Sequence, residues 1–279
     1  ILLLAAGVLT AALWGARRAV QALSRELVDR AALEVEGHLE RLYEPAGEHL
    51  RALGELARLG LLQPGENSAG LEHLALPWFE SKLDIGAFGV FADDGHGVAM
   101  RRTPAGWEAL SIRPGAPASE GGAGGAASED GAAQPVADFD PRRQAWWLDA
   151  SVVDSGMTAH WTDRVEGGLV QRAGLAAARR ILTPQGEGRV VVVELMLQGL
   201  LAHLAALEIT PDAAIGVLDG EQRLVAWSGR AWPHGASAEV LFLHRPRDLG
   251  VALFDDARQA LEASDAGASS EPLRLASGG

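Results

Sequence analysis

The segment Phe139-Asp140-Pro141-Arg142-Arg143-Gln144-Ala145-Trp146-Trp147 places two of the chain's eight tryptophans side by side, just after a proline and two arginines. Pro141 fixes its own φ angle and disfavours helix at the residue before it, so the first two residues are expected to be extended. A short helix can begin at Arg142 and carry both tryptophans. Adjacent helical positions point about 100° apart. We therefore expect one of Trp146 and Trp147 to fill the core and the other to line a cavity; packing of both rings in a core is the alternative.

This segment resembles the Tyr-Asp-Pro-Arg-x-Arg-Pro-Trp-Tyr signature of double Cache domains, which are extracytoplasmic sensor domains of bacterial chemoreceptors, histidine kinases and nucleotide cyclases. Four positions match the signature, namely Asp140, Pro141, Arg142 and Trp146. Four others depart from it: Phe139 stands for the first Tyr, Gln144 for the second Arg, Ala145 for the second Pro and Trp147 for the last Tyr. The resemblance extends over residues 20–279.

The resemblance implies an α+β fold, in which a long N-terminal helix is followed by two PAS-like Cache lobes with central antiparallel sheets. We expect a partial transmembrane helix at 1–19 and a stalk helix at 20–69. A membrane-distal lobe at 70–207 and a membrane-proximal lobe at 208–279 would follow, the latter cut short by the end of the chain. The Gly-, Ala- and Ser-rich stretch 113–137 is expected to be a disordered insertion in the first lobe.

The N-terminal third of the chain has a helical pattern. Residues 1–16 are apolar and uncharged, and a bilayer span needs about 20 such residues; a cleaved signal peptide is the alternative. From residue 20 to 62, apolar side chains recur every three or four positions, as on one side of a long helix. That apolar stripe consists of Leu23, Leu27, Ala31, Val35, Leu39, Leu42, Ala46, Leu50, Leu53 and Ala57. The stripe could form a homodimer seam or pack only on its own domain.

The remaining pattern is mainly that of strands and tight turns. Residues 85–91 and 98–102 are predicted to be strands joined by an Asp-Gly turn, and 107–112 to be a third strand. Residues 214–218 and 223–228 repeat this arrangement around a second turn, which suggests two copies of one sheet motif. The β-branched run at 189–197 predicts the strongest strand of the chain. A linking helix is expected at 200–207.

Composition narrows the possible functions. The chain has 279 residues, a formal net charge of -13, 48% hydrophobic residues and no cysteine. Its acidity disfavours nucleic acid as a partner, because phosphate binding needs a basic surface. The eight histidines form no local metal-binding pair, and no nucleophile or phosphate-loop motif is present. We therefore expect no cofactor, no metal and no catalytic activity in this segment.

The resemblance also implies a ligand pocket in the first lobe. The candidate ligand-binding residues are Phe139, Arg142, Gln144, Trp146, Trp147, Trp161, Asp163 and Glu194. Amino-acid-binding members of the family pair an Arg of the signature with the ligand carboxylate and an Asp on a late strand with its ammonium. Gln144 and Glu194 stand at or near these positions, and Gln cannot make the bidentate pair that Arg makes. An amine, a quaternary ammonium compound or a purine-like ring is therefore favoured over an amino acid. The alternative is that the tryptophans fill the cavity and nothing binds.

These expectations define two candidate functions. The first is an extracytoplasmic small-molecule sensing domain of a membrane-bound signal-transduction receptor, located at the cell inner membrane with this domain in the periplasm or outside the cell. The partners would then be a small ligand, the membrane and a second copy of the chain. The second is a membrane-anchored envelope scaffold or protein-interaction module that has the same fold and no ligand. The sequence leaves open the identity of the ligand and of any cytoplasmic output module.

Overall fold

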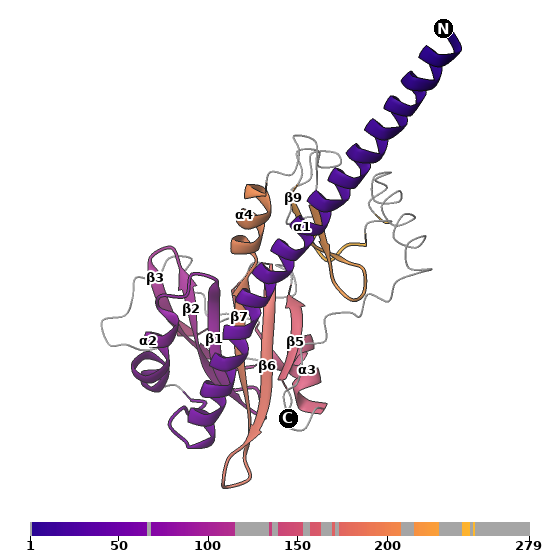
Figure 1. Ribbon diagram of the computed structural model, residues 1–279. Coiled ribbons are helices and arrows are strands. Elements are labelled where there is room, and N and C mark those ends of the chain that lie inside the picture. The colour runs from indigo at the N-terminus through magenta and orange to yellow at the C-terminus, as the bar shows by residue number, and fades with distance from the viewer. Residues whose placement is uncertain are drawn as a thin grey trace.

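The computed structural model of the chain describes residues 2–65, 68–114, 134–135, 139–152, 157–162, 169–170, 173–207, 215–228, 242–245 and 248. In chain order the elements are α1 (Leu2–Arg58), η1 (Leu71–Ala75), α2 (Leu76–Phe79), β1 (Ile85–Ala92), β2 (Gly97–Thr103), β3 (Gly106–Ile112), β4 (Gln134–Pro135), η2 (Pro141–Arg143), α3 (Ala145–Val152), β5 (Met157–Thr162), β6 (Gly174–Leu182), β7 (Gly188–Met196), α4 (Gln198–Ala206), β8 (Ile215–Leu218) and β9 (Leu224–Ser228). A long helix thus precedes a largely antiparallel sheet (Figure 1), which confirms the expected α+β fold.

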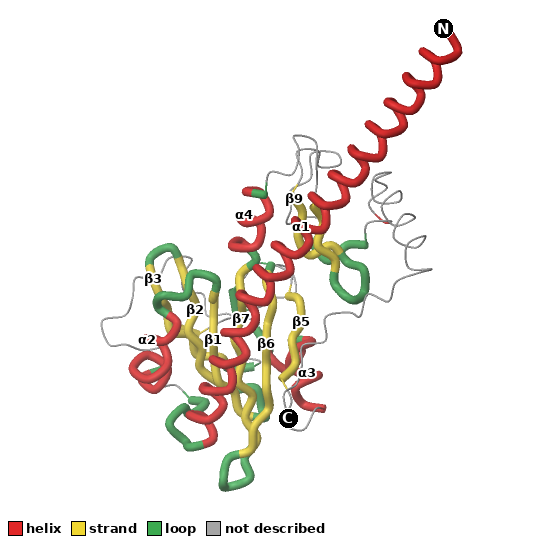
Figure 2. Tube along the Cα trace, in the orientation of Figure 1, coloured by secondary structure: helices red, strands yellow, loops and turns green. Residues whose placement is uncertain are grey.

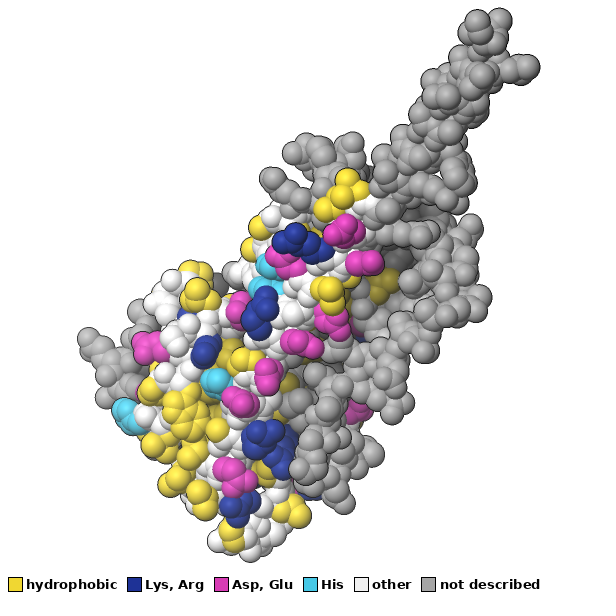
Figure 3. Space-filling model, viewed as in Figure 1, with side chains coloured by type: hydrophobic (Ala, Val, Ile, Leu, Met, Phe, Trp, Pro, Cys, Tyr) yellow, Lys and Arg dark blue, Asp and Glu magenta, His cyan; other side chains and the backbone are white. Residues whose placement is uncertain are grey.

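Helix α1 packs on the sheet through the apolar stripe predicted from the sequence. The helix has 57 residues, or about 85 Å at 1.5 Å per residue, and its N-terminal part extends beyond the sheet (Figure 1). The stripe members Ala31, Val35, Leu42, Ala46, Leu50, Leu53 and Ala57 are buried within the same chain, and α1 packs mainly on β6 and β7. Of the stripe residues, Leu23 and Leu27 at its N-terminal end are exposed, at 59% and 38%. Many acidic and basic side chains lie on the visible face of the molecule along the described part of α1 (Figure 3).

The main sheet has seven strands in the order β4-β3-β2-β1-β7-β6-β5. Figure 2 shows the part of it that runs from β3 to β5. All neighbouring strands are antiparallel except β3 and β4, which are parallel. Strand β1 lies between β2 and β7, where Phe88 faces Met100 on one side and Val193 on the other. The β1–β2 and β2–β3 hairpins agree with the sequence-based prediction. The pairing of β1 with the distant β7 places the strongest predicted strand in the middle of the sheet.

The two faces of this sheet have separate cores. Towards α1, η1 and α2 it presents one set of apolar side chains, which includes Phe88, Val90, Val98, Met100, Leu175, Ala177, Val191, Val193 and Leu195. The opposite face presents Ala87, Phe91, Ala99, Leu110, Ile112, Ala176, Ala178, Val190 and Val192, and it is covered by the signature segment and by Leu169 and Val170. Successive residues of a strand point to opposite faces, so β7 contributes alternate residues to both cores. The second face is the one that carries the candidate site.

Two arginines tie the sheet to the segments around it through backbone carbonyl groups. Arg189 on β7 is buried, and its Nη1 donates to the carbonyl oxygens of Ala57 at 3.0 Å and Leu62 at 2.8 Å. The last carbonyls of a helix have no partner within the helix. Arg189 gives the carbonyl of Ala57 a second donor beside the N–H of Gly60 and also binds the carbonyl of Leu62 just beyond α1. Arg102 on β2 donates in the same way to Phe79 and Ile85, which closes the turn that leads into β1.

A smaller unit follows the sheet. Helix α4 leads from β7 towards the antiparallel hairpin of β8 and β9. Leu200 and Leu204 of α4 pack with Val35 of α1 and with Val225 of β9 in a third core. The predicted strand-turn-strand pattern of the second lobe is therefore confirmed for this hairpin. The rest of the lobe expected at 208–279 lies largely outside the described residues.

Two further expectations concern the N-terminus and the insertion. In the described part of the chain, no helix combines the length and the apolar character needed to cross a membrane. The partial span expected at 1–19 stays a prediction. Most of the stretch 113–137 lies outside the described residues. Within it, Gln134 and Pro135 form β4, which pairs with Leu110 and Ser111 of β3 at the edge of the sheet.

Candidate functional site

The face of the sheet opposite α1 is covered by a cluster of three aromatic rings. The strands supply small side chains here, among them Ala87, Ala99, Ala176 and Ala178, and thus leave room above the sheet. Trp146 and Trp147 occupy that room, with exposed fractions of 0% and 6%. The ring centroids of the two tryptophans lie 6.1 Å apart. The centroid of Phe91 on β1 lies 6.0 Å from that of Trp146 and 6.2 Å from that of Trp147. Such tilted and edge-on contacts are favourable for aromatic pairs.

The burial of both tryptophans differs from the expectation that one ring would line a cavity. The backbone at Gln144 explains the difference, since it is extended, with φ -80° and ψ 140°, between η2 and α3. The carbonyl oxygen of Gln144 accepts from the backbone N–H groups of Trp147 and Leu148. Helix α3 therefore begins after this bend as a separate helix and does not continue η2. The bend turns the first residues of α3 towards the sheet, so both rings reach the same core.

The entrance to α3 is fixed by an ion pair within the signature. Asp140 Oδ1 accepts from the backbone N–H of Arg142 at 3.0 Å, as an N-cap does. The same carboxylate accepts from Nε and Nη2 of Arg142, each at 2.9 Å. The hydrogen bond from the Arg142 guanidinium lowers the pKa of Asp140 below its ordinary value. Arg142 therefore stabilises the turn with its guanidinium at the surface, where 47% of its side chain is exposed.

Among the candidates whose side chains the structure describes, Glu194 on β7 is the one whose charge is buried against this face. Its exposed fraction is 3%, and its carboxylate oxygens accept from the backbone N–H groups of Leu169 and Val170, each at 2.9 Å. Burial raises the pKa of Glu194 to about 6, because the charged form loses its hydration, while the two N–H donors act in the opposite direction. The carboxylate thus fastens a covering segment to the sheet. Gly86 leaves space for Val170, since a Cβ there would lie 2.7 Å from its Cγ2.

The structure brings some of the predicted site residues together and leaves others apart. Phe139, Trp146 and Trp147 share one core, and Glu194 lies on the same face of the sheet. Gln144 is half-buried at the bend, and Arg142 is exposed. Trp161 belongs to β5, where its backbone pairs with Leu175 of β6; its side chain lies outside the described part of the structure, as does the whole of Asp163.

One feature of the site could not be read from the sequence. The Nε1–H of Trp146 is buried and has no hydrogen-bond acceptor among the described residues. An unpaired buried donor costs about 1–3 kcal/mol. The only sequence signal is the tryptophan itself, which gives no information on whether its N–H finds an acceptor. The described residues contain no group of three or more His, Cys, Asp or Glu side chains that could hold a metal ion.

Solved structures with a similar fold are sensor domains of receptors. The extracellular domain of a predicted histidine kinase, rpHK1S-Z16, matches with a TM-score of 0.51 and 14% identity, over 83% of this chain and 77% of that one. The ligand-binding domain of the Pseudomonas aeruginosa amino acid chemoreceptor PctC, in complex with GABA, matches with a TM-score of 0.49 and 14% identity, over 79% and 78% of the two chains. The corresponding domain of the Campylobacter jejuni chemoreceptor Tlp3, in complex with 4-methylisoleucine, has a TM-score of 0.45 and 12% identity, over 72% and 70%.

The match to the histidine kinase domain agrees, at the level of the fold, with the receptor sensor domains that the resemblance implies. At this identity the likeness defines the arrangement of helices and strands, and the match to the histidine kinase domain is the one that carries it. Two of these neighbours are ligand-binding domains of chemoreceptors, and the third is an extracellular domain of a histidine kinase. No protein-family model and no curated protein matches the chain.

Proposed function

We propose that the chain is an extracytoplasmic small-molecule sensing domain of a membrane-bound signal-transduction receptor, with a binding rather than a catalytic role. The observation that carries this proposal is the position of Glu194. A buried carboxylate lies between the sheet and its cover, on the face that the signature segment closes. Buried ionisable groups with raised pKa values are more common at functional sites than elsewhere. The fold shared with the extracellular domain of a histidine kinase supports the same reading.

The ligand favoured by this site is a cation or a flat ring. Each oxygen of Glu194 accepts one backbone N–H group, and a carboxylate has about four acceptor positions in all, so an ammonium group can still be bound. Trp146 and Trp147 lie on the same face of the sheet, and a shift of either ring would provide a surface for stacking or for cation–π contact. Arg142 is engaged by Asp140, and Gln144 carries no charge, so neither supplies a free guanidinium for a ligand carboxylate. An amine, a quaternary ammonium compound or a purine-like ring fits these groups better than an amino acid.

Calorimetric titration of the chain with amines, purines and amino acids tests this assignment. A bound cation favours the charged form of Glu194, so below pH 6 binding must first remove a proton. We expect amine affinity to be about tenfold lower at pH 5 than at pH 7. Glu194→Gln should abolish that pH dependence and weaken amine binding. The matched control is Glu108→Gln, which makes the same change in a carboxylate that pairs with Arg101 on the neighbouring strand. Tight binding of amino acids without amines would contradict the ligand class.

A ligand-free scaffold is the second candidate, and the two tryptophans favour it. Both rings are buried and fill the face that a ligand would occupy. Under this alternative Glu194 only fastens the covering segment at Leu169 and Val170. No member of the ligand panel would then raise the melting temperature, although ligands of the folded state ordinarily do so. Trp147→Phe and Glu194→Gln would change stability alone.

Membrane attachment and dimerisation complete the proposal. We place the domain outside the inner membrane, with α1 running from its surface and a second copy of the chain beside it. The buried part of the stripe is unavailable for a dimer seam, which leaves the exposed Leu23 and Leu27. Sedimentation of the chain should show a dimer that Leu23→Glu with Leu27→Glu converts to a monomer. Leu83→Glu, at a position 74% exposed and distant from α1 in the sequence, is the control. A monomeric wild-type chain would contradict this seam.

A further inference from the structure

Two histidines from distant parts of the chain are stacked face to face. His38 lies on α1 and His203 on α4; their ring centroids are 3.9 Å apart and their planes differ by 4°. The Nε2 atoms of both rings are buried and have no hydrogen-bond partner among the described residues. A neutral imidazole can leave one nitrogen as an unprotonated acceptor, whereas an imidazolium carries a proton on both. The observed geometry therefore suits two neutral rings.

The stack lies where α1, α4 and the β8–β9 hairpin pack together. Helix α4 follows β7 directly, and β7 carries Glu194. Beside the histidines, Val35 and Leu39 of α1 meet Leu200 and Leu204 of α4 in the third core, together with residues of β8 and β9. Any change in the contact between α1 and α4 thus alters how the stalk helix is held by the sheet and by the unit that follows it.

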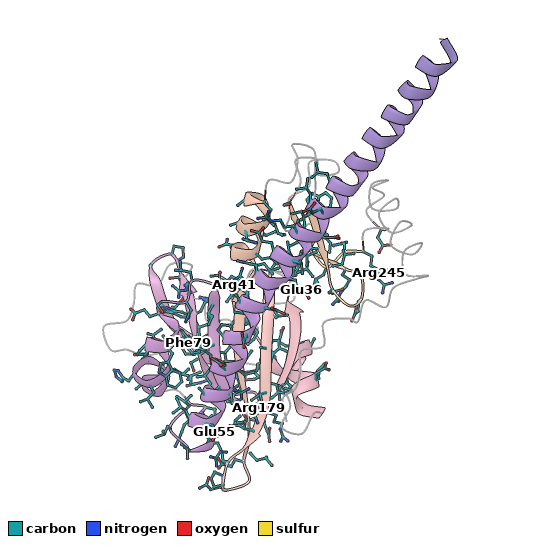
Figure 4. All side chains as sticks on the ribbon, viewed as in Figure 1. Glu36, Arg41, Glu55, Phe79, Arg179 and Arg245 are labelled. Atoms are coloured by element: carbon teal, nitrogen blue, oxygen red, sulfur yellow. The ribbon has the colours of Figure 1, made fainter. Side chains whose placement is uncertain are left out.

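The charged groups around the stack oppose a second positive charge there. Burial lowers the pKa of His38 below its ordinary value of 6.5, the charges of His203 and Arg41 lower it further, and Asp84 acts in the opposite direction. Arg41 follows His38 by about one turn of α1 (Figure 4). The carboxylate of Asp84 abuts Gly199 at the start of α4. Apart from His203, α4, β8 and β9 contain no titratable side chain.

We propose that the His38–His203 stack is a proton-sensitive contact, which holds α4 against α1 while both rings are neutral and opens when they take up protons. Protonation would bury a new N–H without an acceptor and would set two cations face to face. Both effects are costly in a partly buried site. A histidine with a lowered folded-state pKa contributes stability that is present above pH 6.5 and is lost as the pH falls. The proposal is independent of any ligand at Glu194, and it gives the stalk helix a response to acidity.

Spin labelling of the full chain measures the opening directly. The chain has no cysteine, so Glu40→Cys on α1 and Ala202→Cys on α4 place nitroxides at two exposed positions only. We expect a narrow distance distribution at pH 8 and a longer, broader one at pH 5. In the double variant His38→Phe with His203→Phe, a stack that cannot titrate should keep the narrow distribution at both values. His73→Gln, which changes an exposed histidine, should behave as the wild type does.

Three outcomes would overturn the proposal. A wild-type distribution that is unchanged between pH 8 and pH 5 would show that the contact does not respond to protons. Broadening of the double phenylalanine variant at pH 5 would assign the response to other groups. Narrowing of the wild-type distribution at pH 5 by Zn²⁺, with none in the phenylalanine variant, would make the pair a metal site. Titration of Glu194 cannot mimic the effect, since its raised pKa makes acidification stabilising.

A second measurement applies if the double variant does not fold. The Cε1 proton of His38 reports its titration by NMR in the wild-type chain and in His203→Gln. Loss of the neighbouring charge should move the titration of His38 to higher pH. Identical titration curves would contradict a coupled pair.

Discussion

The guanidinium of Arg189 donates a hydrogen bond to the carbonyl oxygen of Ala57 at 3.0 Å, across 132 positions of sequence. This hydrogen bond joins strand β7 to the last turn of α1. The same Nη1 also reaches Leu62 beyond the helix. Because the three groups are shielded from water, this contact contributes more than a surface ion pair of the same length.

Replacement of Arg189 tests that contact. Arg189→Met keeps much of the apolar stem but leaves the buried carbonyl of Leu62 without the donor it has now, while that of Ala57 keeps only the N–H of Gly60. We expect a loss of about 2 kcal/mol in the free energy of unfolding. Urea denaturation measures it. Arg58→Met, which removes the exposed pair with Glu55 on the same helix, is the control and should cost under about 1 kcal/mol. Equal losses in the two variants would contradict a specific role for Arg189.

Glu194 makes a distinct prediction for the dependence of stability on pH. Burial raises its pKa from 4.5 to about 6. The folded state therefore binds more protons than the unfolded state in this window, and stability increases as the pH falls from 6 to 4.5. Relative to Glu194→Gln, the wild-type chain should gain about 2 kcal/mol over that interval. Urea midpoints across pH 4 to 8 give the difference, and parallel curves for the two chains would show that the carboxylate titrates normally.

Asp140 is expected to act in the opposite direction at lower pH. The hydrogen bond from Arg142 lowers the pKa of Asp140 below its ordinary value of 3.8. The ionised carboxylate therefore stabilises the folded state above pH 3.8, and this stabilisation is lost as the pH falls through the lower pKa of the folded state. Asp140→Ala should cost about 1 kcal/mol at pH 7, in line with the loss of an N-cap. Asp140→Asn keeps an acceptor for the N–H of Arg142 and should cost less. A larger loss for Asn than for Ala would contradict the capping role.

A glycine at the start of β2 offers a steric test of the sheet register. A Cβ at Gly97 would come unacceptably close to the carbonyl oxygen of Val90 and to the ring of Phe91. Gly97→Ala must therefore displace the β1–β2 pairing, and we expect a marked fall in melting temperature. Gly65→Ala is the control, because no atom lies within 4 Å of the position of its Cβ. It should be neutral or slightly stabilising. Similar melting temperatures for the two variants would mean that the strands pair differently.

Local sequence patterns predicted the elements of this fold but not the contacts between distant ones. The stripe on α1, the Asp-Gly hairpin and the extended entry to the signature each follow from rules that act within a few residues. Their placement agrees with the structure. The pairing of β1 with β7 depends on chain segments 100 residues apart, for which periodicity carries no information.

In the candidate site, too, local features were predictable from the sequence, whereas contacts between distant segments were not. Burial of an aromatic pair was foreseeable, whereas the joint burial of Trp146 and Trp147 depends on the backbone bend at Gln144. The sequence marked Glu194 by its resemblance to a ligand-binding position. Its actual partners are backbone N–H groups of Leu169 and Val170, and backbone groups have no sequence signature. The stacking of His38 on His203 was hidden for a related reason, since each histidine stands alone in its own segment.

The alternation along β7 has a consequence for how the sheet finds its register. Residues 190–193 are four consecutive valines. Each of them is apolar enough to pack in the core on either face of the sheet. A slip of one residue exchanges the faces of a whole strand, and the valines alone do little to prevent it. Arg189 and Glu194 bracket them with opposite charges that point to opposite sides, each met by backbone partners on one side only. A slipped strand would separate Arg189 and Glu194 from these backbone partners, so the two side chains favour a single alignment of β7.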